Sequence, residues 1–124
     1  MTRVLIVDDS PTEVYKLTRI LTKHGYAVLT SSNAEEGVNT ARLEQPDVVL
    51  MDVVMPGLNG FQATRQLARG RETAHIPVIV VTMKNQETDK VWASRQGARA
   101  YLTKPVTEKQ LLTAIMQVAE HTPG

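Results

Sequence analysis

Three aspartates stand directly after two apolar runs of the sequence, and their chemistry depends on whether they meet in space. The first run, residues 4–7, is followed by Asp8 and Asp9, and the second, residues 48–51, is followed by Asp52. An apolar run that ends in a carboxylate is typical of a buried strand that delivers charge to the edge of a sheet. Carboxylates on neighbouring strands repel one another unless a cation lies among them. The pattern therefore predicts a metal site, and one of its carboxylates is a candidate nucleophile.

The types of side chain in this set indicate a hard cation. Aspartate oxygens suit Mg²⁺ and leave coordination positions open for water and a phosphate oxygen. The set contains no imidazole or thiolate, which argues against zinc and copper. Aspartate also accepts phosphoryl groups covalently. Asp52 is the expected nucleophile because it stands alone after its strand, whereas Asp8 and Asp9 stand together and are better suited to hold the metal.

Two residues further along the chain can supply the remaining charge and hydrogen bonds. Phosphoryl transfer needs positive charge and donors around the equatorial oxygens of the phosphoryl group. Thr82, at the end of a third apolar run, and Lys104 are predicted to provide them beside the metal. Pro105 follows the lysine, and an X-Pro bond adopts the cis form at modest cost. We therefore expect a cis Lys104–Pro105 bond that aims the lysine toward the acids.

Length and composition exclude several classes of protein. The 124 residues fit one domain of ordinary size, expected over residues 1–124 without a second domain. A hydrophobic share of 42% with only 4% aromatic residues indicates a globular chain with an aliphatic core. The net charge of +1, from mixed basic and acidic residues, argues against nucleic-acid binding. No apolar stretch approaches the roughly 18 residues of a membrane span, so with no cysteine present we expect a cytoplasmic protein.

Turn and capping signals between the apolar runs predict five strands that alternate with five helices. Two capping boxes are expected, from Ser10 to Glu13 and from Asn33 to Glu36. The strands are predicted over residues 3–7, 26–30, 47–52, 76–82 and 99–102, and the helices follow each of them, beginning near residues 11, 34, 61, 86 and 107. Alternation of this kind indicates an α/β doubly wound parallel sheet with helices on both faces. Ligands of such sheets bind at the carboxyl ends of the strands, where the aspartates, the threonine and the lysine are expected.

The full set of motifs resembles the receiver domain of two-component response regulators, over essentially the whole chain. The set consists of Asp8-Asp9, Asp52 with Met55-Pro56-Gly57 shortly after it, Thr82, and Tyr101-Leu102-Thr103-Lys104-Pro105. The resemblance implies a flavodoxin-like, five-stranded sheet with strand order 2-1-3-4-5. The single-domain layout, without an effector domain, resembles chemotaxis-type regulators. The sequence as a whole is most similar to those of regulators of twitching motility by type IV pili.

The resemblance also implies roles for individual residues. Asp52 would accept a phosphoryl group from a histidine kinase. Asp9, Asp52 and the backbone carbonyl of Val54 would bind Mg²⁺, and Asp8 would assist through a water molecule. Thr82 and Tyr101 would form a switch, in which the hydroxyl moves to the phosphoryl group and the ring turns inward.

The expected output surface comprises the fourth helix, the fifth strand and the fifth helix, where a downstream protein would bind. The protein would be a monomer that catalyses only its own phosphorylation and dephosphorylation. Met83 stands where the family usually has a small residue, and neither Val54 nor Lys84 carries a carboxylate or amide that would position water. We therefore predict slow hydrolysis of the phosphorylated form.

Competing functions lack the residues that they need. A phosphatase that forms an aspartyl-phosphate would need a second carboxylate two residues after the nucleophile, where Val54 stands. A flavin carrier or a nucleotide-binding protein would need a phosphate-binding loop that the sequence does not contain. The alternative that stays open is a phosphate sink that competes with a sibling regulator for one kinase. Also open is the role of Trp92, which either anchors the fourth helix or contacts a partner.

Overall fold

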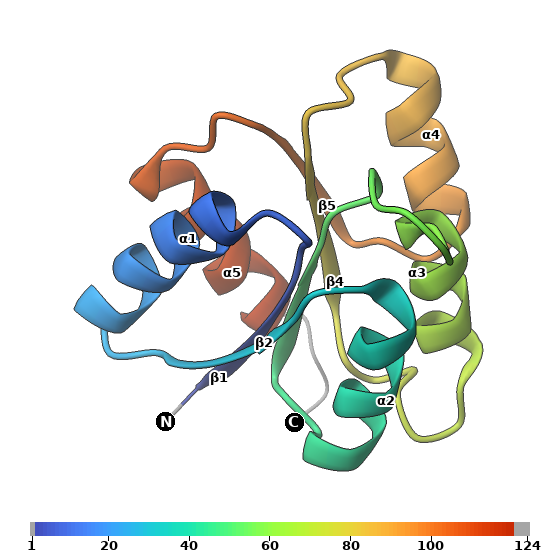
Figure 1. The fold of residues 1–124 in the computed structure, drawn as a ribbon, viewed down its shortest axis with the longest axis horizontal. Helices are drawn as coiled ribbons and strands as arrows, with labels where there is room; N and C mark the ends of the chain where they lie inside the picture. The colour runs from blue at the N-terminus through green and yellow to red at the C-terminus, as the bar shows by residue number, and fades with distance from the viewer. Residues whose placement is uncertain (1, 121–124) are drawn as a thin grey trace.

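The computed structural model describes residues 2–120, whose five strands form one parallel sheet (Figure 1). The strands are β1 (Arg3–Val7), β2 (Ala27–Ser31), β3 (Val48–Met51), β4 (Val78–Thr82) and β5 (Ala100–Thr103). Their order across the sheet is β2-β1-β3-β4-β5, as predicted, with β3 at the centre. The α/β doubly wound fold class is thereby confirmed.

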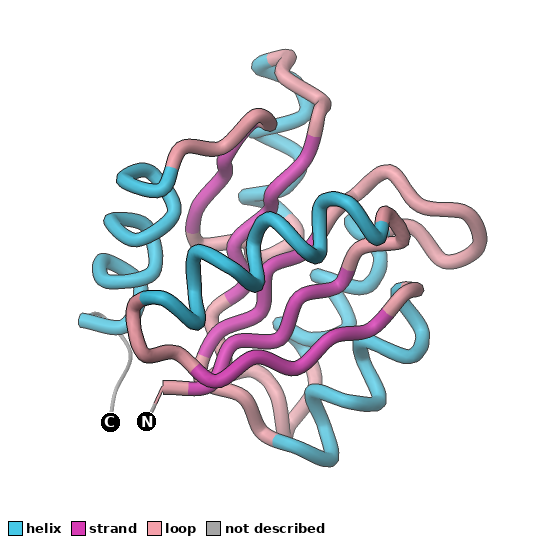
Figure 2. The backbone as a smooth tube through the Cα atoms, turned by 60° about the vertical axis from the view of Figure 1, so that its left-hand side comes forward, coloured by secondary structure: helices cyan, strands magenta, loops and turns pink. Residues whose placement is uncertain are grey.

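Helices cover both faces of the sheet (Figure 2). They are α1 (Pro11–Lys23), α2 (Ala34–Glu44), α3 (Gly60–Arg69), α4 (Glu87–Arg95) and α5 (Glu108–Glu120). Alternate residues of β1 face opposite layers, so that Val4 and Ile6 pack with α1 and α5, whereas Leu5 and Val7 pack with α2 and α3. A smaller cluster, which contains Ala93, attaches α4 to the edge of the second layer. Within residues 2–120, no helix has both the length and the apolar character needed to cross a membrane.

The predicted elements are all present, and their ends agree with the prediction to within two residues. β4 begins at Val78 and not at residue 76, because Pro77 has no N–H to donate to the ladder, although its carbonyl accepts from Val49 at 3.0 Å. The capping box predicted for α1 is only half formed. Ser10 accepts from the Glu13 N–H at 3.4 Å, but its own N–H donates to the Asp8 carboxylate at 2.9 Å. A buried carboxylate thus takes the donor that the capping box would have used.

The register of the central strands fixes what lies at the carboxyl edge of the sheet. Val7 pairs with Met51, and Met51 pairs with Val80. The residues that follow the first two strands, Asp8 and Asp52, therefore leave the sheet side by side. Thr82 pairs with Thr103 on β5, which brings the segment after β5 to the same edge.

Candidate functional site

The three aspartates converge at the carboxyl ends of β1 and β3. Each of Asp8, Asp9 and Asp52 offers one carboxylate oxygen, and these oxygens all lie within 4.8 Å of one another. Asp8 and Asp52 are buried, whereas Asp9 is exposed to solvent. The sequence predicted this convergence from the apolar runs, and the strand register produces it.

Lys104 enters the acid cluster from the segment after β5. Its Nζ donates to Asp8 Oδ2 at 2.7 Å and to Asp52 Oδ2 at 3.0 Å, and its side chain is only 7% exposed. Its backbone N–H donates to the Thr82 carbonyl at 2.8 Å, which ties this segment to the end of β4. The Lys104–Pro105 peptide bond is cis, as the sequence analysis expected.

Backbone amides hold the other oxygens of the two buried acids. The Ser10 N–H donates to Asp8 Oδ1 and the Val54 N–H donates to Asp52 Oδ1, both at 2.9 Å. Each buried carboxylate is therefore fixed in orientation by one amide and one ammonium. A nucleophilic carboxylate gains from such fixed geometry, because less motion must be frozen when it reacts.

Burial and charge act in opposite directions on the groups of this cluster. Burial raises the pKa of Asp8 above its ordinary value, and the hydrogen bonds from Lys104 and Ser10 only partly oppose this effect. Burial would lower the pKa of Lys104, but its hydrogen bonds to Asp8 and Asp52 and their charges outweigh burial and raise it. The lysine is thus held in its charged form by the two acids.

The charges and donor types in the cluster fit a divalent cation. Three carboxyl groups face one ammonium, so acidic groups outnumber basic groups in this partly buried place. Asp9, the exposed member, is on the open side of the cluster and has no ion-pair partner among residues 2–120. All the side-chain ligands are oxygens, the donors that Mg²⁺ prefers.

Thr82 and Tyr101 lie close to the cluster, and only one of their two hydroxyl groups has a hydrogen-bond partner. The Thr82 side chain is fully buried, and its hydroxyl has no hydrogen-bond partner. A buried hydroxyl without a partner is costly, and this one is free to donate to an acceptor that enters the site. The Tyr101 hydroxyl donates to the Lys84 carbonyl at 2.8 Å. Burial, followed by the charges of Asp89 and Asp52, raises the pKa of Tyr101 to about 12.

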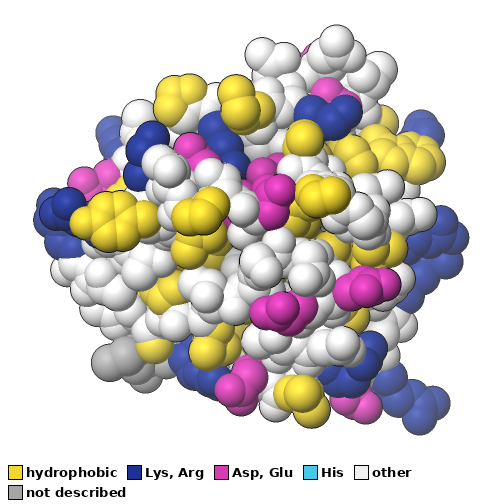
Figure 3. All heavy atoms as spheres, viewed as in Figure 1, with side chains coloured by type: hydrophobic (Ala, Val, Ile, Leu, Met, Phe, Trp, Pro, Cys, Tyr) yellow, Lys and Arg dark blue, Asp and Glu magenta, His cyan; other side chains and the backbone are white. Residues whose placement is uncertain are grey.

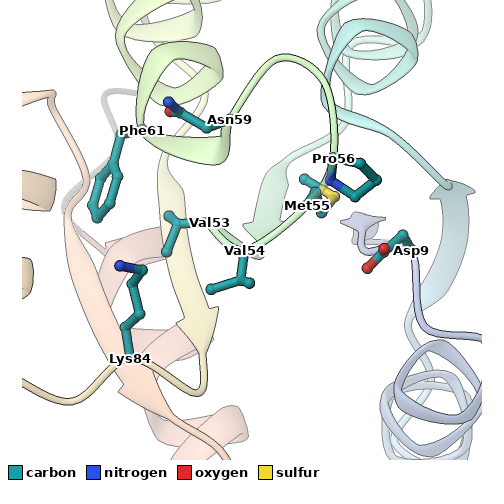
Figure 4. A pocket seen from close by; sticks show the side chains of 8 residues that line it. All are labelled: Asp9, Val53, Val54, Met55, Pro56, Asn59, Phe61 and Lys84. Carbon is teal, nitrogen blue, oxygen red and sulfur yellow. The ribbon is translucent and has the colours of Figure 1, made fainter.

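A hollow of about 460 Å³ opens beside the acids (Figure 4). Asp9 lies at one end of it, and Phe61 and Lys84 lie at the other. Its lining comprises Asp9, Val53, Val54, Met55, Pro56, Asn59, Phe61 and Lys84. Met83, which stands where the family usually has a small residue, is 76% exposed and does not line the hollow.

Gly60 is a part of the site that the sequence analysis missed. A Cβ at this position would lie 2.2 Å from the Asp52 carbonyl oxygen and 2.6 Å from the Val53 Cα. The first turn of α3 therefore rests directly on the backbone that presents Asp52. A capping box between Asn59 and Gln62 fixes this turn. The Asn59-Gly60 pair, with Gln62 three residues after the asparagine, was the signal available in the sequence.

The sequence is similar to those of known proteins. Residues 4–116 match the model of the response regulator receiver domain. The chain is 68% identical over 118 residues to Protein PilH of Pseudomonas aeruginosa, a match that covers 95% of this chain and 98% of that protein. It is also 35% identical over 109 residues to the regulatory protein PhoP of Bacillus subtilis, covering 88% of this chain but only 45% of that longer protein.

Solved structures show the same arrangement of elements. A CheY-like receiver domain protein of Methanospirillum hungatei superposes with a TM-score of 0.91 at 28% identity, over 98% of this chain and 96% of that one. The receiver domain of a sensor histidine kinase of Pseudomonas aeruginosa superposes with a TM-score of 0.89 at 25% identity, over 96% and 98% of the two chains. That structure has a magnesium ion coordinated in its active site cleft.

Proposed function

The chain belongs to the response regulator receiver domain family, and on that premise we propose that it is a phosphorylation-dependent signalling protein with Asp52 as its phosphoacceptor. The donor would be the phosphohistidine of a histidine kinase. In the transfer, an Asp52 carboxylate oxygen forms a bond to phosphorus as the bond from phosphorus to the imidazole nitrogen breaks. The chain would catalyse only this reaction and the later hydrolysis of its own acyl phosphate.

The observation that carries the proposal is the fixed position of the Asp52 carboxylate. One of its oxygens accepts from the Val54 amide, and the other accepts from Lys104, which also bridges to Asp8. During transfer the Lys104 ammonium would neutralise charge that develops on the phosphoryl oxygens. The unpartnered hydroxyl of Thr82 would donate a hydrogen bond to one of them.

A divalent cation belongs to the same proposal. Asp9, Asp52 and the Val54 carbonyl would hold Mg²⁺, with Asp8 acting through a water molecule. When bound, this ion would supply positive charge beside the transferred group. The excess of carboxylates over ammonium groups in the cluster supports this assignment.

The signal would leave the site through Thr82 and Tyr101. A phosphoryl group adds charge and acceptor oxygens at one point, which favours movement of the Thr82 hydroxyl toward it. The Tyr101 hydroxyl is bonded to the loop between β4 and α4, so the ring would respond to movement of that loop. The output surface would be α4, β5 and α5, on a cytoplasmic monomer that binds a downstream protein and not nucleic acid.

Phosphorylation is tested by intact-mass analysis after incubation with Mg²⁺ and acetyl phosphate. We expect wild type to gain one phosphoryl group and Asp52→Asn to gain none. Asp47→Asn is a matched control, because Asp47 is exposed before β3, at the opposite edge of the sheet. An adduct that persists in Asp52→Asn, or its absence from wild type, would contradict the assignment.

We further propose that the pathway is a chemotaxis-like system that controls twitching motility. The identity to Protein PilH over nearly the full length of both chains supports this choice. Expression in Pseudomonas aeruginosa that lacks PilH should restore surface movement, and the Asp52→Asn variant should not. A phosphate sink is the competing function. It would drain phosphate from a kinase shared with a sibling regulator while binding no output protein, which phosphotransfer assays with both regulators would reveal.

A further inference from the structure

Helix α4 presents an apolar surface that nothing in the described chain covers. Of its nine residues only Ala93 is buried. Val91 and Trp92 are 49% and 50% exposed, and the remaining residues are polar or charged. A tryptophan that is only half covered leaves apolar area in water, which a partner can remove.

The Trp92 side chain borders a hollow of about 240 Å³ between α3 and α4. The hollow is lined by Asn59, Phe61, Gln62, Arg65, Trp92 and Gln96. Its aromatic side chains come from the two different helices, so an inserted side chain would contact a ring from each. In Figure 3 hydrophobic side chains gather where α3 and α4 meet, with basic side chains beside them.

The charge around this hollow is unbalanced. Lys84 and Lys90 have partners within the region, since they lie 3.9 Å from Asp89 and 3.6 Å from Glu87. Arg65 is exposed, and no carboxylate of residues 2–120 forms an ion pair with it. A guanidinium with free donors beside aromatic rings is suited to bind a carboxylate in a bidentate manner. The charge complement of this place is therefore acidic.

The hollow adjoins the one beside the acid cluster. Asn59 and Phe61 line both of them. A molecule that displaces or covers the Phe61 ring would therefore alter the entrance to the site that contains Asp9.

We propose that the cleft between α3 and α4 is a docking site for a helix of a partner protein. The helix would insert one large apolar side chain between Phe61 and Trp92 and pair a carboxylate with Arg65. This surface shares α4 with the output surface proposed above, but it pairs that helix with α3 in place of β5 and α5. The proposed docking is argued from the cleft alone. Only the coupling between docking and Asp52 phosphorylation rests on the proposed function.

The test selects partners from a display library of short helical peptides. Peptides are selected on wild type and counter-selected against Trp92→Ala. Enriched sequences should carry a large apolar residue with Asp or Glu about one helical turn away. Trp92 is the single tryptophan of the chain, so its fluorescence reports binding of the purified peptides directly.

Charge variants then distinguish specific docking from nonspecific binding. Arg65→Glu should weaken binding by about tenfold or more, as expected for a central contact. Arg71→Glu, an equal charge change on the exposed loop after α3, should leave the affinity unchanged. Peptides whose acid is replaced by lysine should regain affinity for Arg65→Glu. The proposal is overturned if selection yields no preference for wild type over Trp92→Ala, if the enriched peptides lack acids, or if both arginine variants bind alike.

Coupling is measured as the rate of phosphorylation by acetyl phosphate with and without a selected peptide. A bound peptide should change this rate, because it covers Phe61. Failure of wild type to take up phosphate would contradict the proposed function and leave the peptide affinities, and so the docking site, intact. Peptides that bind but leave the rate unchanged would refute the coupling.

Discussion

Replacement of Gly60 by alanine tests how the backbone presents Asp52. The new Cβ would lie 2.2 Å from the Asp52 carbonyl oxygen and 2.9 Å from its carbonyl carbon. Both atoms belong to the backbone, so no side chain can rotate away. An ordinary van der Waals contact would require α3 and this backbone to separate by about 1 Å.

A displacement of this size is expected to be costly for the reaction. A misplacement of about 1 Å at a reacting group slows a positioned reaction by about a hundredfold, which is about 2.7 kcal/mol of activation free energy. We therefore expect Gly60→Ala to take up phosphate about a hundredfold more slowly than wild type.

The assay measures the rate of phosphorylation at saturating acetyl phosphate and Mg²⁺. Gly37→Ala is the matched control, because this helical glycine is also packed against the sheet. Its Cβ would lie 2.7 Å from a methyl of Val7, a side chain that can shift, and not against the backbone. Urea unfolding of both variants measures the loss of stability separately from the loss of rate. A folded Gly60→Ala that reacts at the rate of wild type would refute the idea that α3 braces the phosphoacceptor.

Four further predictions concern the side chains around the acids and the neighbouring loop. Lys104→Met should lower the free energy of unfolding by about 3 kcal/mol in the absence of Mg²⁺, because it leaves buried carboxylates unpaired. In urea titrations, added Mg²⁺ should restore part of this loss. Equal stability of the variant and wild type would contradict the prediction. Lys84→Glu should shorten the lifetime of the phosphorylated form by about tenfold, because a carboxylate can position water at the hollow. Met83→Ala should change the lifetime less, because the Met83 side chain is exposed to solvent. Unchanged lifetimes in both variants would contradict the prediction that these loop residues make hydrolysis slow. Tyr101 has a folded pKa of about 12, above its unfolded value of about 10, so wild type should lose stability between about pH 10 and 12 and Tyr101→Phe should lose less there; parallel losses in urea unfolding would contradict the assigned shift.

Much of the fold could be predicted because local sequence patterns indicate each strand and helix. The alternation of apolar runs with capping signals defines where strands and helices begin, and each run is short enough to identify a buried strand. The parallel direction of the strands then follows from the need for crossovers, whereas their order was implied by the family resemblance. Strand β4 begins later than predicted because of Pro77, and the capping box of α1 is incomplete because the Ser10 N–H donates to Asp8.

The parts that could not be predicted depend on contacts between distant segments. The close approach of Gly60 to Asp52 and the cleft between Phe61 and Trp92 arise from the way α3 packs on the sheet and beside α4. Neither contact corresponds to a periodic pattern of residues in the sequence. The capping box at Asn59 shows that α3 starts there but not what its first turn touches.

The sequence by itself determined which residues could do chemistry, because carboxylates after buried runs must reach the carboxyl edge of a parallel sheet. Only the tertiary structure decided how these residues share their charges. Lys104 bridges Asp8 and Asp52, Asp9 faces solvent, and the Thr82 hydroxyl is left without a partner. The physical reason is that a sequence pattern fixes the strand end from which a side chain emerges, whereas distances, burial and hydrogen bonds depend on segments far apart in the chain.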